Sequence, residues 1–129
     1  MPYASYRKFR IWGYFVSHSS LLLRSSYNKE EKKDKFNIDI EFAGVDYLDI
    51  PITLHGISIE EIKENLPEKF AKYQGSSRYR VFQISSTANH YIVAANYLVG
   101  KNKWDYGEDR MMNPLLKHDE ILATYPPRG

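Results

Sequence analysis

Hydrophobic and polar residues alternate along much of this chain with the two-residue period of a β-strand that is dry on one face. The clearest case is NIDIEF, where Ile38, Ile40 and Phe42 alternate with polar side chains. The same criterion predicts further strands over residues 9–16, 21–23, 45–50, 79–85 and 90–100. Both faces of the last segment carry large apolar residues, so we expect it at the centre of a sheet.

Polar stretches separate these segments. Residues 17–20 (SHSS) fit a hairpin turn, because the backbone of a connection is solvated. The mixed charges of residues 26–35 predict a solvated loop. Pro51 has no backbone donor and should end the strand before it.

Residues 58–73 carry the best helix signal. Ser58 followed by Glu61 matches a capping box, and Pro67 predicts a kink. Apolar residues recur there at helical spacing, at Ile59, Ile62, Leu66, Phe70 and Tyr73. We therefore expect one α+β domain over residues 1–129: a curved antiparallel sheet or partly open barrel of about six strands, packed against one kinked helical segment, with a frayed tail at 124–129.

Composition narrows the classes of function. The chain has 18 basic and 16 acidic residues and no cysteine, so neither a disulfide framework nor a thiolate metal site is possible. The apolar patch IWGYFV near the start is too short for an export signal, and no run approaches the roughly 20 apolar residues that cross a bilayer. We expect a soluble, cytoplasmic protein, and nothing in the sequence indicates a cofactor.

A hydrolase or isomerase is one candidate activity. His18 lies among serines, and Asp39 or Glu41 could supply a carboxylate from a neighbouring strand for acid and base chemistry. However, no Gly-x-Ser-x-Gly elbow is present, and adjacent residues on a strand point to opposite faces. The two carboxylates are interpreted more simply as the solvated face of a strand.

Two other kinds of site have weaker support. The histidines are far apart in sequence and lack the spacing typical of zinc ligands, so we expect no metal site. Arg10, Arg78 and Arg80 lie among aromatic residues, a pattern that suits single-stranded nucleic acid. Acidic residues on the intervening strands, Asp39 among them, would repel the same backbone.

Aromatic residues are the most unusual part of the composition, with 11 Tyr, 6 Phe and 2 Trp. There are more large aromatic side chains than a core of this size can bury. The candidates for a ligand- or partner-binding surface are Trp12, Tyr14, Tyr47, Trp104 and Tyr106. We therefore favour a noncatalytic binding or protein-interaction module with an aromatic-rich surface or cleft. The partner could be a small molecule, another protein or a second copy of the chain.

Three segments follow one another in the first half of the chain: SHSSLLLRS, NIDIEFAGVDYLDIP and TLHG. Together, over residues 12–61, they resemble small uncharacterised bacterial proteins of the kind encoded by mobile integron gene cassettes. The resemblance implies a bacterial, cytoplasmic accessory protein, and it brings no active site with it.

Overall fold

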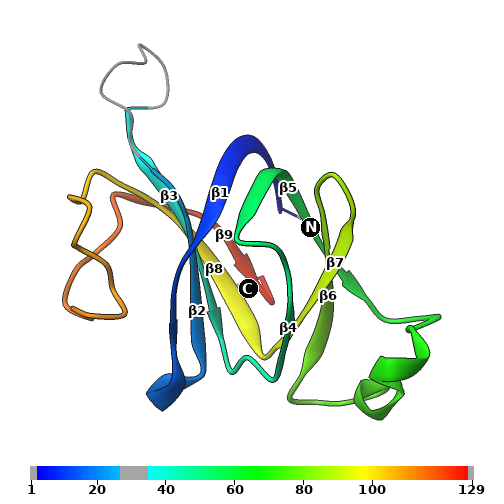
Figure 1. Cartoon of the computed structure of the whole chain (residues 1–129). Coiled ribbons are helices and arrows are strands. Elements are labelled where there is room, and N and C mark those ends of the chain that lie inside the picture. Colours follow the sequence, from blue (N-terminus) through cyan, green and yellow to red (C-terminus); the bar gives the residue numbers. More distant parts are fainter. Residues whose placement is uncertain (1–2, 27–34, 128–129) are drawn as a thin grey trace.

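The computed structural model describes residues 3–26 and 35–127, and the strands of these residues form one curved antiparallel sheet (Figure 1). The strands are β1 (Tyr3–Phe15), β2 (Ser20–Ser25), β3 (Asn37–Ala43), β4 (Tyr47–Asp49), β5 (Thr53–Ile62), β6 (Arg80–Ser85), β7 (Asn89–Ala94), β8 (Asn96–Asn102) and β9 (Glu120–Tyr125). They lie in the order β4-β7-β6-β5-β1-β2-β3-β8-β9. Two short 3₁₀-helices accompany them, η1 (Val16–His18) and η2 (Glu68–Tyr73).

The predicted α+β class is wrong, because the kinked helix expected over residues 58–73 does not form. Its first part belongs to β5, which pairs with β1 on one side and β6 on the other. Ile57 and Ile59 point into the core at two-residue spacing, and β-branched residues favour a pleated strand. Within residues 58–73 only η2, a 3₁₀-helix that begins directly after Pro67, is helical.

The other predicted strand segments coincide with β1, β2, β3, β4, β6 and β7–β8, while the expected charged loop lies largely outside the described residues. The hairpin turn contains η1 and ends at Ser19, whose φ is 48°. The predicted strand over residues 90–100 is divided at Ala95, whose backbone N–H donates to Ala43 O. β9 had not been predicted, and it includes Thr124 and Tyr125.

The sheet curls so that its two halves face each other across an aromatic core. Phe42 of β3 lies edge-on to Phe82 of β6. Tyr125 of β9 stacks on Tyr97 and lies edge-on to Phe82, and its hydroxyl donates to Glu61 Oε1 on β5. The last strand therefore packs against the opposite half, although the sheet does not close.

Strands β2 and β3 are buried on both faces, and this feature positions the candidate site. One face carries the leucine and isoleucine side chains of the main core. The other face carries Arg24, Asp39 and Glu41, and the connection between β8 and β9 covers them. The course of this connection can be followed in Figure 1. Within the part of the chain that the structure describes, no helix is long and apolar enough to span a membrane.

Replacing Tyr125 with phenylalanine should make the free energy of unfolding less dependent on pH under alkaline conditions. Burial, and next the hydrogen bond to Glu61, raise the pKa of Tyr125 from 10.0 to about 12. The protonated phenol therefore stabilises the fold fully below about pH 10, and this contribution is lost as the pH rises through about 12. The free energy of unfolding of Tyr125→Phe, measured in denaturant, should fall less steeply over this window than that of the wild type. Tyr106→Phe, on an 84% exposed side chain, is the control; equal slopes for Tyr125→Phe and wild type would contradict the prediction.

Candidate functional site

An arginine–carboxylate pair lies at the centre of the covered face. Arg24 and Asp39 are cross-strand partners on β2 and β3, and their side chains are 1% and 0% exposed. Arg24 Nε donates to Asp39 Oδ1 at 2.6 Å, and Nη2 donates to Asp39 Oδ2 at 2.8 Å. Nη2 also donates to the carbonyl oxygen of Glu108 at 2.7 Å, which ties the covering segment to the sheet.

Asn102 extends this pair into a longer network. Its Oδ1 accepts the backbone N–H of Trp104, so its Nδ2 must be the donor to Asp39 Oδ2 at 3.3 Å and to His118 Nδ1 at 3.1 Å. Because Nδ1 accepts, we assign the His118 proton to Nε2, which donates to Glu41 Oε2 at 2.8 Å. The network thus fixes both the tautomer and the orientation of His118.

The His118 ring lies directly on the backbone of β8. A Cβ atom at Gly100 would fall 2.3 Å from the ring, so only glycine fits beneath it. Trp104 stacks on His118 with ring centroids 4.7 Å apart. The imidazole is therefore enclosed, and its side chain is 0% exposed.

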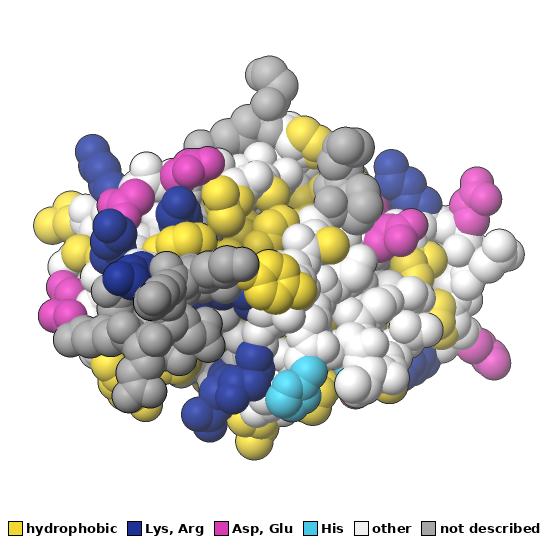
Figure 2. All heavy atoms as spheres, turned by 90° about the horizontal axis from the view of Figure 1, so that it is seen from above, with side chains coloured by type: hydrophobic (Ala, Val, Ile, Leu, Met, Phe, Trp, Pro, Cys, Tyr) yellow, Lys and Arg dark blue, Asp and Glu magenta, His cyan; other side chains and the backbone are white. Residues whose placement is uncertain are grey.

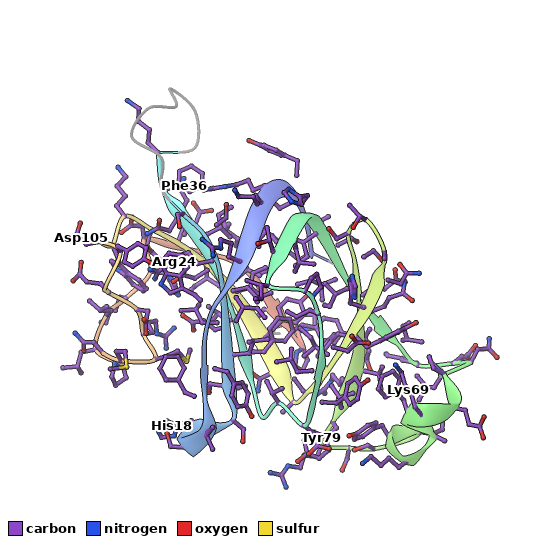
Figure 3. All side chains as sticks on the ribbon, viewed as in Figure 1. His18, Arg24, Phe36, Lys69, Tyr79 and Asp105 are labelled. Atoms are coloured by element: carbon purple, nitrogen blue, oxygen red, sulfur yellow. The ribbon has the colours of Figure 1, made fainter. Side chains whose placement is uncertain are left out.

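A cavity of about 640 Å³ opens beside this network. Its lining residues come from β1, β2 and the residue after it, β3, and the segment that follows β8: Trp12, Arg24, Ser26, Asn37, Lys103, Trp104, Asp105 and Tyr106. Tyr106 lies edge-on to Trp12, with centroids 4.8 Å apart, and the Arg24 guanidinium carbon lies 5.1 Å from the Trp12 ring. Arg24 and Asp105 are labelled in Figure 3.

The structure brings together three of the five aromatic residues proposed for ligand or partner binding. Trp12, Trp104 and Tyr106 all line the cavity. Tyr14 is 43% exposed and is not part of the lining. Tyr47 packs edge-on against Phe70 in a separate aromatic cluster.

The proposed catalytic residues are not brought together. His18 is exposed in η1 at the tip of the first hairpin (Figure 3). Asp39 is engaged by Arg24, and Glu41 is engaged by His118 and by Arg110 at 3.4 Å. The expectation that Asp39 and Glu41 face solvent is wrong, because the covering segment leaves them 0% and 9% exposed.

The arginines proposed for nucleic acid are divided between distant strand ends. Arg10 pairs with Thr53 at the start of β5, whereas Arg80 begins β6 beside the end of β5 and donates to Ala95 O. Arg78 lies over the ring of Tyr79. On the face shown in Figure 2, basic side chains are interspersed with acidic ones.

One group of described residues has the composition of a metal site. Ligand atoms of Asp39, Glu41 and His118 lie within 4.8 Å of one another. Both oxygens of Asp39 accept from Arg24, and Arg110 lies against Glu41, so a divalent cation would sit between two guanidinium groups. The protonated Nε2 of His118 also faces Glu41 rather than a shared ion position. This arrangement fits a hydrogen-bonded network better than a metal centre.

Sequence reasoning missed Arg24, Asn102 and His118. A signal existed for Arg24, since an arginine that follows three leucines on a strand opposite NIDIEF must find a carboxylate if both faces are buried. His118 had no such signal, because it lies 77 residues from Glu41 in a segment without periodicity.

Comparisons of the chain with family models, with curated proteins and with solved structures give no match. The resemblance of residues 12–61 to cassette-encoded proteins stays a prediction.

Gly100→Ala should displace the His118 ring and so disturb the hydrogen bonds that His118 makes with Asn102 and Glu41. The added methyl group would overlap the His118 ring, and overpacking of this kind costs about 1–3 kcal/mol. We expect a lower free energy of unfolding in denaturant and a shifted Trp104 indole resonance. Gly107→Ala, in the connection that follows β8 and with no atom within 4 Å of the new Cβ, should change neither. If the two variants behave alike, His118 is not held as described.

Arg24→Ala should destabilise the protein by about 3–5 kcal/mol, because it leaves Asp39 buried without its partner. Arg24→Met combined with Asp39→Leu removes both charges and should recover most of this loss. Chemical denaturation of the wild type and the two variants tests the difference. A double variant as unstable as Arg24→Ala would show that loss of packing, rather than the unpaired carboxylate, dominates.

Proposed function

We propose that the protein is a noncatalytic binding module and that its ligand is a small molecule with a planar ring, held in the cavity beside Arg24. The observation that carries this proposal is the convergence of Trp12, Trp104 and Tyr106 on that cavity. Its volume of about 640 Å³ is in the range of small-molecule sites, which are mostly apolar with a few polar groups.

The aromatic side chains of the cavity are available for stacking. Tyr106 is 84% exposed, and Trp12 and Trp104 are partly buried. Rings of this kind favour offset or edge-on contacts with another ring, worth about 0.5–1.5 kcal/mol each beyond the area they bury. Burying the exposed ring of Tyr106 against a ligand would add a hydrophobic gain.

The acid and base groups near the cavity support a binding role more than a catalytic one. Glu41 and His118 are bonded to each other beneath Trp104, and Asp39 is neutralised by Arg24. A general base needs access to the proton that it removes. Among the described residues, no carboxylate is hydrogen-bonded to or ion-paired with His18, so the alternative activity through His18 gains no support from this part of the chain.

We also infer that the protein works in the bacterial cytoplasm. The absence of cysteine is compatible with a reducing compartment. The resemblance of residues 12–61 to cassette-encoded bacterial proteins supports the same location.

Tyr106→Ala should weaken binding of a bicyclic aromatic probe such as indole about three- to tenfold, because one wall of the cavity is lost. The two tryptophans of the chain both line the cavity, so their indole N–H resonances report binding directly in a ¹⁵N-labelled protein. Tyr14→Ala is the matched control and should leave the dissociation constant unchanged. The proposal fails if indole moves neither resonance, or if both variants weaken binding equally.

A further inference from the structure

Arg24 retains hydrogen-bonding capacity that no described residue uses. Its Nε and Nη2 are bonded to Asp39 and Glu108, whereas Nη1 is buried without a hydrogen-bond partner. A buried donor left in this state is costly, and a guanidinium donates from all three nitrogens when it can. Since Arg24 also lines the cavity, an acceptor on a ligand could supply the missing partner.

An aromatic pair lies beside the guanidinium. The ring of Trp12 lies 5.1 Å from Arg24 Cζ, and Tyr106 lies edge-on to Trp12. Because Tyr106 is 84% exposed, little packing opposes its rotation away from Trp12. Such a rotation would let a ring enter beside Trp12 and direct an oxygen at Nη1.

We propose that the ligand is an uncharged, planar ring amide whose carbonyl oxygen accepts a hydrogen bond from Arg24 Nη1. This inference rests on the proposed function and names the chemistry that the same cavity selects. Asp105, which also lines the cavity, offers an acceptor for the ring N–H of such an amide.

The charges around the cavity favour a neutral acceptor over a carboxylate. Asp39 already neutralises Arg24 through two hydrogen bonds. Lys103 and Asp105 both line the cavity, and their opposite charges offset each other. A carboxylate at Nη1 would therefore be a second anion on one buried guanidinium that Asp39 already neutralises. The interaction with Arg24 would not compensate for the free energy needed to remove that carboxylate from water. A carbonyl oxygen satisfies the donor without this cost.

Three probes of similar size separate the possibilities: quinolin-2-one, an uncharged ring amide; indole, a ring without a carbonyl; and 2-naphthoate, an anionic ring. Each is titrated into ¹⁵N-labelled protein while the indole resonances of Trp12 and Trp104 are followed. We expect quinolin-2-one to bind about tenfold more tightly than indole, as one added hydrogen bond to a charged donor allows. We expect 2-naphthoate to bind no more tightly than indole.

The double variant Arg24→Met with Asp39→Leu provides the decisive control, because it removes the donor without leaving Asp39 unpaired. In this variant quinolin-2-one should lose its advantage, so that the ratio of the quinolin-2-one and indole dissociation constants falls to about one. Equal binding of quinolin-2-one and indole to the wild type, tightest binding of 2-naphthoate, or an advantage of quinolin-2-one that survives in the double variant would each overturn the inference. If no probe moves either resonance, the proposed function itself fails.

Discussion

The burial of Arg24 against Asp39 on the second face of β2 and β3 is the interaction on which the rest of the site depends. Two charged groups at 1% and 0% exposure are tolerable only when nearly every donor and acceptor is used. Asp39 meets this condition through Arg24 and Asn102, and Arg24 meets it in part through Glu108. The pair thus requires that the connection between β8 and β9 cover this face of the sheet. It also supplies hydrogen bonds that hold this connection in place.

The covering connection, residues 103–119 of the described chain, contains no strand or helix. Polar contacts therefore determine its position: Asn102 orients His118, His118 binds Glu41, and Trp104 stacks on the imidazole. Gly100 makes this possible by leaving room for the ring. Trp104 in turn forms one wall of the cavity, so the shape of the proposed binding site depends on contacts made beneath it.

Two-residue alternation predicted β3 correctly at Ile38, Ile40 and Phe42, where no competing period existed. It did not resolve β5, because Ile59 and Ile62 satisfy helical spacing while Ile57 and Ile59 satisfy strand spacing. Hydrogen bonds from β1 and β6 decided between the two, and a single sequence does not show them. Periodicity likewise says nothing of residues 103–119, which carry half of the cavity wall. Three of the five proposed aromatic residues nevertheless line the cavity, Trp12 from β1 and Trp104 and Tyr106 from this segment. Large rings in a polar segment are a signal that does not depend on strand register.

The strand order has a consequence for how the molecules behave at high concentration. β4, at one end of the sheet, has only three residues and is soon followed by Pro51, which lacks a backbone donor. So short an edge strand offers another chain few backbone N–H and C=O groups to pair with. This protects that edge of the sheet against strand-to-strand aggregation. β9, at the other end, has six residues with Ile121 and Leu122 partly uncovered, so any strand-to-strand aggregation of the described sheet should begin there.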